Sequence, residues 1–489
     1  MDRWSALSIA AIVIGIIAIG LGASFIAAYH GPAKVSVITT VERYVTTVIK
    51  QIAAAPASTV SVTHTTTVTK YLTTTSTVTS TVTKSVALTT TTTPHKKIKV
   101  LVLFDVGGRG DLSFNDMAWM GAERAAKDFG IVVQFNRPPS VRDMVPFLES
   151  YAKSHQYALI VLVGFLWTAP LKQVAPKFPD QKFALIDATT GVVRPNEVDL
   201  LFKEQQTGAL VGFLAAELAH ELMIKEHKSG PIIIGTVMGM DIPPLWRFHI
   251  GYLWGAKLYQ ELTGIPVKVL WVYTGTFTDP KAGYTAAWKM LQQGALVLYQ
   301  LAGATGIGVL NAVVDWNKKG YGKAFAIGED ASQEWYAPWY IPLSGAKRVD
   351  VAVYDAIKMV VTGNWKPGIY RLGLKQHAVG IWDLQGVKWF AELAYQYHKL
   401  PKGLTPEKVV EIVKKLREEY ISKWAWCVVH NLEKAIINGQ IQFINPKNHQ
   451  QYESIVKALE SGDLKAALAV FKLSSFKQLE QGCPPPPWG

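Results

Sequence analysis

The sequence predicts an α/β protein with two doubly wound parallel sheets, and two observations support this fold class. From residue 97 onward, short apolar runs alternate with longer amphipathic segments, which is the pattern of strands followed by crossover helices. The number of apolar runs suits two sheets rather than one. With 489 residues and 49% hydrophobic content, the chain can also bury sizeable cores in more than one domain.

The alternation assigns most of the chain after residue 97. Strands are predicted at 98–104, 131–135, 158–163, 182–187, 231–236, 267–273, 296–301, 323–327 and 379–382. Helices are predicted at 116–129, 141–153, 205–222, 247–262, 280–293, 305–318, 346–361 and 404–439. We expect residues 401–489 to form a helical extension with the proline-rich end CPPPPWG.

Residues 1–30 are predicted to form a transmembrane anchor. Trp4 to Tyr29 contains no charged residue and would be roughly 39 Å long as a helix, against a hydrocarbon core of about 30 Å. A secretory signal peptide is the alternative, although its apolar core has only about 7–15 residues. No cysteine follows this apolar run, which excludes a lipid-modified cysteine there.

Residues 31–96 are rich in Thr, Ser and Val, which is typical of an extracellular stalk that carries O-linked glycans. The sequence has no Asn-x-Ser/Thr site for N-linked glycans. Two alternatives remain for this stalk. The apolar spacing from Ile38 to Ile52 suits a short coiled coil, and the later Thr/Val alternation suits β pairing between molecules.

The charge, the cysteine content and the motifs of the sequence limit the classes of function that this protein can have. The formal charge of +13 comes from basic residues that are spread along the chain, so we expect a solvated or membrane-facing surface and no nucleic-acid partner. Cys427 and Cys483 are either one disulfide or two unrelated thiols, and they have no zinc-site spacing. The HExxH, GxSxG, GxxxxGK[ST] and CxxC motifs are missing from the sequence, which weakens the case for an enzyme.

Polar residues after the predicted strands indicate a binding site. The segment Gly107 to Gly121 joins a strand to a helix at the carboxyl edge of a parallel sheet, and it brings Asp111, Ser113 and Asn115 to that edge. Three further carboxylates follow strands, where each could bind a ligand or simply cap the next helix: Asp187, Asp279 and Asp330. Lys347 is a donor that could pair with Asp330, and GATGIG at 303–308 is a tight turn whose amides could reach a ligand.

From Lys97 to Ile441 the chain resembles the basic membrane protein family of solute receptors, which includes purine nucleoside receptors of ABC importers. The resemblance rests on motifs in the family's order: GGRGDLSFND, GFLWTAP, FPDQKFALID, FKEQQTGALVGFLAAELA, GTVMGMDIPPLWRFHIGYLWGAKL, TGTFTDPKAGYTAAWKMLQQGA, LAGATGIGVL, AIGEDASQ, AKRVDVAVYDAIK and IINGQI. It implies a type I periplasmic-binding-protein fold, in which two lobes joined by a hinge enclose the ligand. The implied solute-binding domain is 97–400, with lobe 1 at about 97–225 and 330–372 and lobe 2 at about 229–328 and 373–400.

The resemblance also implies roles for twelve residues. Trp119 and Phe277 would stack on the two faces of a base, and Asn115 and Asp187 would read its edge. Asp330, Lys347 and the amides near Gly303 would hold the ribose. The remaining residues would shape the first loop or the wall of the cleft: Asp111, Ser113, Phe114, Gly164 and Phe165. No catalytic residue, metal or cofactor is expected.

This chain departs from the family's usual pattern in several places. Glu329 and Ser332 replace an apolar and an acidic residue on the ribose side, and Trp119 is larger than the ring expected there. The sequence therefore predicts a membrane-tethered extracellular receptor that binds a nucleoside, with a purine favoured, and delivers it to an ABC importer's permease. The alternatives are a receptor for a sugar or another small solute, a filament-forming surface protein on the same fold, and, third, a nucleoside-cleaving enzyme.

Overall fold

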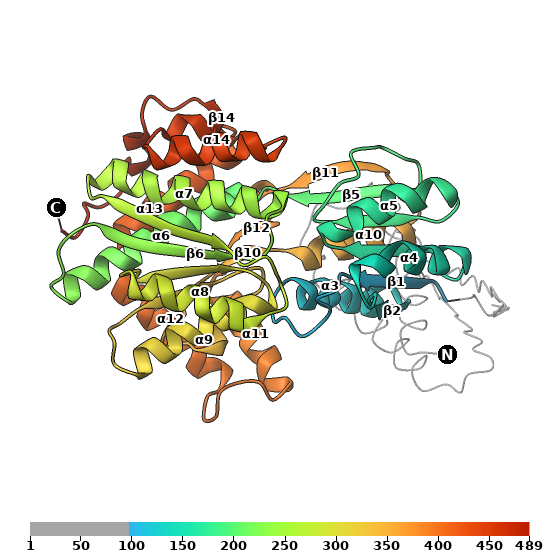
Figure 1. The fold of residues 1–489 in the computed structure, drawn as a ribbon, viewed down its shortest axis with the longest axis horizontal. Helices are drawn as coiled ribbons and strands as arrows, with labels where there is room; N and C mark the ends of the chain where they lie inside the picture. The colour runs from blue at the N-terminus through green and yellow to red at the C-terminus, as the bar shows by residue number, and fades with distance from the viewer. Residues whose placement is uncertain (1–96, 489) are drawn as a thin grey trace, which may run out of the picture. The chain divides into compact units, whose positions relative to one another are not determined.

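The computed structural model describes residues 97–488. The predicted anchor, the predicted stalk and any self-association through that stalk lie outside the described residues. The described part contains two six-stranded sheets and one two-stranded sheet, which confirms the expected α/β fold with two mainly parallel sheets (Figure 1).

The first lobe is built on a fully parallel sheet in the order β11-β5-β4-β3-β1-β2. Alternate residues of its strands face two separate cores: Val100 and Val102 pack with α3, whereas Leu101 and Leu103 pack with α4 and α5. Its elements are β1 (Lys99–Phe104), α3 (Phe114–Phe129), β2 (Val132–Asn136), α4 (Met144–Lys153), β3 (Leu159–Val163), α5 (Thr168–Val174), β4 (Phe183–Ile186), β5 (Glu197–Phe202), α10 (Val349–Val361) and β11 (Gly368–Leu372).

The second lobe is built on the sheet β12-β10-β9-β8-β6-β7, in which only the β10–β12 pair is antiparallel among the described strands. Helices α6 and α7 pack together, as do α8 and α9. Its elements are α6 (Glu204–Lys225), β6 (Ile232–Met238), α7 (Pro243–Thr263), β7 (Val267–Tyr273), α8 (Pro280–Gln292), β8 (Val297–Leu301), α9 (Ala304–Lys318), β9 (Phe325–Gly328), β10 (Leu343–Lys347), β12 (Val379–Ile381) and α11 (Leu384–Gln396).

The lobe boundaries lie at other residues than those expected. Helix α6 packs on α7 and so belongs to the second lobe, although the expected first lobe ran to residue 225. Strand β10 pairs with β9 of the second sheet, so residues 330–347 also lie there. The predicted helix at 346–361 begins at Val349, because residues 346–347 complete β10.

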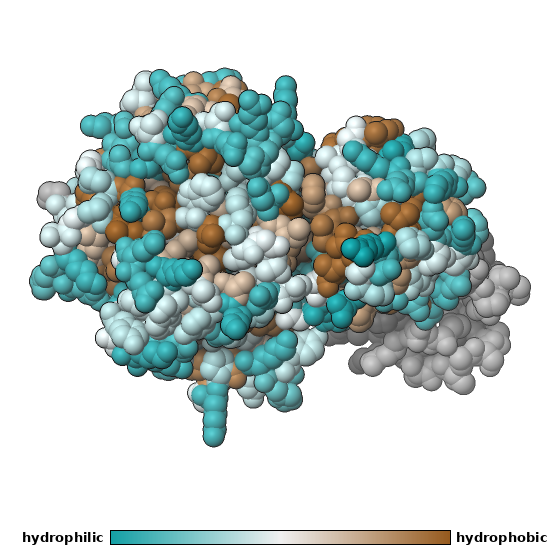
Figure 2. All heavy atoms as spheres, in the orientation of Figure 1, coloured by the Kyte–Doolittle hydropathy of each residue, from teal (hydrophilic) through white to brown (hydrophobic). Residues whose placement is uncertain are grey.

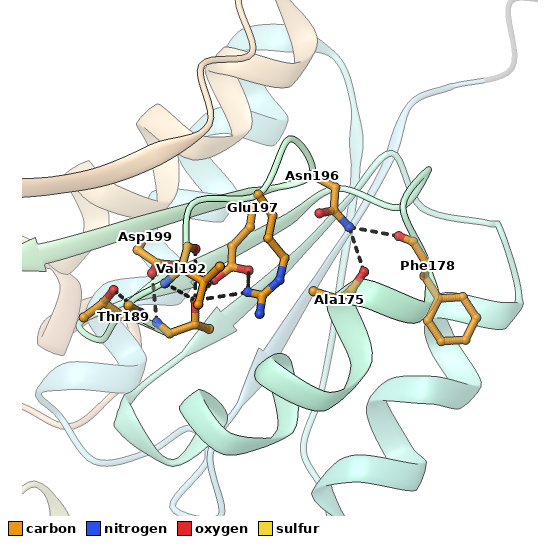
Figure 3. A network of polar contacts seen from close by, with 10 residues as sticks. Ala175, Phe178, Thr189, Val192, Asn196, Glu197 and Asp199 are labelled. Atoms are coloured by element: carbon orange, nitrogen blue, oxygen red, sulfur yellow. Dashed lines mark hydrogen bonds and ion pairs between the residues drawn. The ribbon is translucent and has the colours of Figure 1, made fainter.

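Three strands of the two large sheets were not predicted: β5, β10 and β11. In β5 the acidic residues Glu197 and Asp199 interrupt the apolar pattern, yet both are buried. Figure 3 shows local partners of these two residues: Asp199 accepts a hydrogen bond from the amide of Thr190 at 2.9 Å, and Glu197 pairs with Arg194 at 2.5 Å. In the same network Asn196 donates to the carbonyls of Ala175 and Phe178.

The C-terminal extension packs on the second lobe. The predicted helix at 404–439 is two helices, α12 (Pro406–Tyr420) and α13 (Lys423–Ile437), because the side chain of Ser422 caps a new helix. The remaining elements are β13 (Ile441–Phe443), α14 (His449–Glu460) and β14 (Leu468–Phe471). The Trp254 indole of α7 donates to the carbonyl of Leu464 at 3.0 Å, and Cys427 and Cys483 form a disulfide.

Helices α14 and α6 bury their apolar residues in different ways. On α14, Tyr452, Ile455, Val456 and Leu459 are buried, and Figure 2 shows mainly hydrophilic residues over its outer side. Among residues 97–488, α6 is the one helix with the length and apolar composition to span a bilayer. It is a core helix of the second lobe, since 89% of its apolar window is buried.

Candidate functional site at the lobe junction

The chain passes between the lobes three times. It crosses between the end of β5 at Phe202 and the start of α6 at Glu204, between β10 at Lys347 and α10 at Val349, and between β11 at Leu372 and β12 at Val379. Polar residues at these crossings, at the start of α3 and after β4 and β9 are buried where the lobes meet. They form the candidate site.

A buried ion network lies at two of the crossings. The Lys347 Nζ atom is 2.6 Å from Asp187 Oδ2 and 3.2 Å from Glu204 Oε1. The Arg247 guanidinium binds both oxygens of Glu204, at 2.5 and 3.1 Å. Burial alone would raise the pKa of Glu204, but the charges of Arg247 and Lys347 lower it to about 2. Both cations therefore pair with carboxyl groups of the protein, although burial raises the pKa of Asp187 to about 8.

The loop before α3 is held by two aspartates and reaches the second lobe. The Asp111 carboxylate accepts hydrogen bonds from the amides of Ser113, Asn115 and Asp116, and Asp116 accepts from the amides of Gly110 and Leu112. This arrangement leaves the Ser113 hydroxyl free to donate to the second lobe. It lies 2.6 Å from Asp330 Oδ2 and 2.9 Å from the carbonyl of Glu329.

Two phenylalanine rings, one from each lobe, lie beside glycines. Phe114 of the first lobe is partly buried, with Lys347 Nζ 5.4 Å from its ring centroid. A Cβ atom on Gly164 would lie 3.6 Å from this ring. Phe277 of the second lobe packs so closely on Gly239 that a Cβ atom there would lie 2.3 Å from the ring. Only glycine therefore leaves space for the observed position of Phe277.

Several buried oxygens of the site have no hydrogen-bond partner among the described residues: Asn115 Oδ1, Asp187 Oδ1 and Glu329 Oε1. Such groups are costly to bury alone and mark places where a ligand can supply the missing partner. Burial and the neighbouring Asp330 raise the pKa of Glu329 well above its usual value, which favours the neutral form, in which a carboxyl group can both donate and accept. Its other oxygen accepts from the hydroxyl of Tyr299.

Some of the residues predicted for the site meet at the junction and others do not. The residues at the junction are Asp111, Ser113, Phe114, Asn115, Gly164, Asp187, Asp330 and Lys347. Phe277 and Gly303 contact each other in the second lobe. Phe165 packs in the core of the first lobe that α4 and α5 cover. Trp119 packs edge-on against Phe135 at 4.9 Å, with the Arg109 guanidinium over both rings.

The three carboxylates predicted after strands have different roles. Asp279 caps α8, because its side chain accepts from the amides of Lys281 and Ala282. Asp187 and Asp330 lie instead in left-handed backbone conformations, with φ of 68° and 64°, and are buried. The expected pairing of Lys347 with Asp330 is not observed. The lysine pairs with Asp187 and Glu204, whereas Asp330 accepts from Ser113.

Sequence reasoning missed three residues of the site, Asp105, Glu204 and Arg247, and it noted Glu329 only as a departure from the family pattern. Asp105 follows β1 just as Asp187 follows β4, so its position was a usable signal. Its carboxylate accepts from the amide of Gly107 at 3.0 Å, and burial raises its pKa. Glu204 and Arg247 lie within helical segments, and nothing in their local sequence shows that they meet. No cluster of three His, Cys, Asp or Glu residues suited to a metal exists within residues 97–488.

Comparison with known proteins identifies the class. Residues 98–423 match the family model of PnrA-like ABC transporter substrate-binding proteins, so the chain belongs to this family of substrate-binding proteins. A crystal structure of an ABC transporter solute-binding protein from Aeropyrum pernix K1 is similar to it, with 51% identity and a TM-score of 0.74 over 76% of this chain and all of that one.

The relatives include archaeal and bacterial proteins. An uncharacterized lipoprotein of Pyrococcus abyssi is 61% identical over 380 residues, which are 78% of this chain and 92% of that protein. Basic membrane protein A1 of Borrelia garinii is 27% identical over 363 residues, 73% of this chain and 91% of that protein. These matches confirm the family predicted from the sequence motifs. They also agree with a receptor rather than an enzyme.

Proposed function

We propose that the protein is a membrane-tethered extracellular receptor that binds a nucleoside, with a purine favoured, at the lobe junction and delivers it to an ABC importer. The observation that carries this proposal is the group of unpartnered buried oxygens on Asn115, Asp187 and Glu329. They lie among residues from both lobes, and the Phe114 ring lies beside Lys347 in the same region. A ligand that joins the two lobes can satisfy these oxygens and stabilise the closed arrangement.

The charges of the site favour an uncharged ligand. Lys347 and Arg247 already pair with Asp187 and Glu204, so the charged groups of both residues are engaged within the protein. The unpaired oxygens of Asn115 and Asp187 need hydrogen-bond donors, which sugar hydroxyls and the amino or imino groups of a base provide. A nucleoside therefore fits better than a nucleotide. A sugar fits the polar groups equally well but makes less use of two aromatic rings.

We assign the stacking role to Phe114 and Phe277. Phe114 lies beside Gly164 and Lys347 at the junction, whereas the ring of Trp119 is 8% exposed and contacts Phe135 and Arg109. Stacking by aromatic side chains contributes about 1–3 kcal/mol per base. In this arrangement Ser113 and Asp330, which already join the lobes, lie where they can turn toward the ribose.

The tether is part of the proposal. The Pyrococcus abyssi relative is a lipoprotein by name. In this chain both cysteines form a disulfide in the extension, so a lipid-bearing cysteine is not available. We therefore propose that the apolar segment within residues 1–30 anchors the protein and that residues 31–96 hold the receptor domain away from the membrane.

Calorimetry on the full-length chain tests the ligand. Adenosine, guanosine, inosine, cytidine, ribose and glucose are titrated in turn, and we expect the purine nucleosides to bind most tightly. Phe114→Ala and Phe277→Ala should each weaken binding about five- to a hundredfold because a stacking surface is lost. Tyr395→Ala, at an exposed ring in α11, is the control and should bind normally.

The polar side of the site has its own test. Asp330→Ala should weaken nucleoside binding by roughly ten- to a hundredfold, since hydrogen bonds to charged groups contribute about 1.5–3 kcal/mol. Asp180→Ala, at an exposed aspartate, is the matched control. If calorimetry shows a heat of binding for glucose or ribose but for no nucleoside, the protein is a sugar receptor and the nucleoside assignment is wrong. Equal affinity of Asp330→Ala and the unaltered chain would contradict the role of Asp330.

A further inference from the structure

A cavity of about 280 Å³ lies where two of the lobe crossings meet the C-terminal extension. We call it the hinge cavity. One wall comes from the crossing after β5 and from the segment that joins β11 to β12, and the other comes from residues 436–445 of the extension. Its polar lining includes Lys203, Gln206, Arg371, Lys375, Gln376 and Gln442.

The hinge cavity is positively charged. Three cations line it, Lys203, Arg371 and Lys375, and no aspartate or glutamate is among its lining residues. None of the ion pairs within residues 97–488 includes any of the three. All three residues are exposed, yet partial burial and the nearby positive charge of Arg247 lower the pKa of Arg371. An anion would relieve this repulsion.

Two glutamines of the hinge cavity are oriented as donors. Gln206 Oε1 accepts from the amide of Leu374 at 2.8 Å, and Gln376 Oε1 accepts from the amide of Gly373 at 3.0 Å. These bonds use the amide oxygens, so the NH₂ group of each glutamine remains available to a ligand. A lining of cations and amide donors without carboxylates suits an oxyanion.

The extension completes this cavity. Gln205 at the start of α6 donates through Nε2 to the carbonyl of Ile444 at 3.0 Å, which holds the extension beside the crossing. Residues 436–445 lie beyond residues 98–423, which match the family model. The hinge cavity therefore combines residues of the matched region, among them Lys203, Arg371 and Lys375, with residues of the extension.

We propose that the hinge cavity binds a small phosphate-class oxyanion, either free phosphate or the phosphate of a polar headgroup. The guanidinium of Arg371 can bind two oxygens at once, and Lys203 and Lys375 supply point charges. Arg371 belongs to β11 of the first lobe, whereas Lys375 lies in the crossing between β11 and β12. An anion held by both stabilises the arrangement in which Ser113 meets Asp330.

Titration of inorganic phosphate into the full-length chain in detergent, at constant ionic strength, tests the site. We expect one binding event per chain that weakens at least tenfold in the double variant Arg371→Gln, Lys375→Gln. Lys172→Gln, at an exposed lysine of α5, should leave it unchanged. Equal phosphate binding in all three proteins, or none in the unaltered chain, would overturn the proposal.

Two further experiments identify the source of the phosphate group and its effect on nucleoside affinity. Competition with glycerol phosphate separates the sources, because tighter binding of glycerol phosphate indicates a lipid headgroup and tighter binding of inorganic phosphate indicates the free ion. The coupling to lobe closure rests on the proposed nucleoside function, and it predicts that phosphate raises nucleoside affinity only when Arg371 is present. Phosphate binding without any nucleoside binding would keep the hinge site and reject the proposed function.

Discussion

Helix α6 carries two buried glutamates whose surroundings have opposite effects on charge. Glu204, at the first turn and the lobe junction, contacts Arg247 and Lys347, and these charges lower its pKa to about 2. Glu217, farther along the helix, faces the extension and accepts from the Tyr259 hydroxyl and the Ser422 amide, both at 2.9 Å. Burial raises its pKa to about 7.

The comparison shows that burial alone does not decide the charge of a carboxylate. At the junction, two cations keep Glu204 ionised and make it the common partner of residues from separate elements. At the extension, neutral partners leave Glu217 to respond to pH. The first glutamate therefore supports the site through charge, and the second supports the attachment of the extension through hydrogen bonds.

The largest expected effect is that of Glu204→Gln. The substitution leaves Lys347 and Arg247 buried with one carboxylate, Asp187, between them. Breaking a buried ion pair by removing one partner typically costs about 3–5 kcal/mol. We expect a loss of this size in the free energy of unfolding, measured by guanidinium chloride denaturation.

Glu418→Gln on α12 is the control for this substitution, because Glu418 is exposed and pairs with Lys414 on the surface. It should change the free energy of unfolding by at most about 0.5 kcal/mol. A loss in Glu204→Gln no larger than in the control would mean that the junction cations do not depend on Glu204.

The second prediction concerns the crosslink within the extension, which also contains Ser422, one of the two partners of Glu217. Replacing both Cys427 and Cys483 by Ala removes a crosslink with a sequence separation of 56 residues. We expect the free energy of unfolding to fall by about 2–4 kcal/mol, the usual contribution of a disulfide. Chemical denaturation under non-reducing conditions measures it.

Adding a reductant provides the matched control, since it should lower the stability of the unaltered chain and leave the double alanine variant unchanged. If the extension detaches as a separate step, the two proteins will also differ in protease sensitivity after residue 423. Equal stability of the two proteins without reductant would show that packing on α6 and α7 alone fixes the extension.

Most of the fold could be predicted from the sequence because its strands and helices have strong periodicity. Strands such as 98–104 and 267–273 agree with β1 and β7 to within a residue. Strand β5 was missed because Glu197 and Asp199 break its apolar pattern, and their partners become visible only in three dimensions. The break between α12 and α13 was also missed, although Ser422 is a good capping residue.

The site could be predicted only in part, for a related reason. Residues that follow strands, such as Asp187 and Asp330, were found because a parallel sheet collects its strand ends at one edge. Glu204 and Arg247 were not, because they meet through the packing of α6 on α7, 43 residues apart along the chain. The motif alone also gave no reason to prefer Phe114 over Trp119, which differ in what covers them.

The smallest expected effect is that of Glu217→Gln, and it appears only as a change in pH dependence. The native carboxyl has a pKa of about 7 against an ordinary value of 4.5, so between these values the native state binds more protons than the unfolded state. Its contribution to stability is complete below about pH 4.5 and is lost as the pH rises through about 7. Glutamine stays neutral throughout and can accept from the Ser422 amide as before.

Denaturation of both proteins at several pH values from 4.5 to 8 therefore separates the two kinds of glutamate. Near pH 4.5 the variant should match the unaltered chain, and near pH 8 it should be more stable by on the order of 2 kcal/mol. The difference between the two curves cancels the other titrating groups. If the variant instead loses the same free energy of unfolding at every pH, Glu217 acts as a charged acceptor, as Glu204 does. The contrast between these two glutamates of α6 would then disappear.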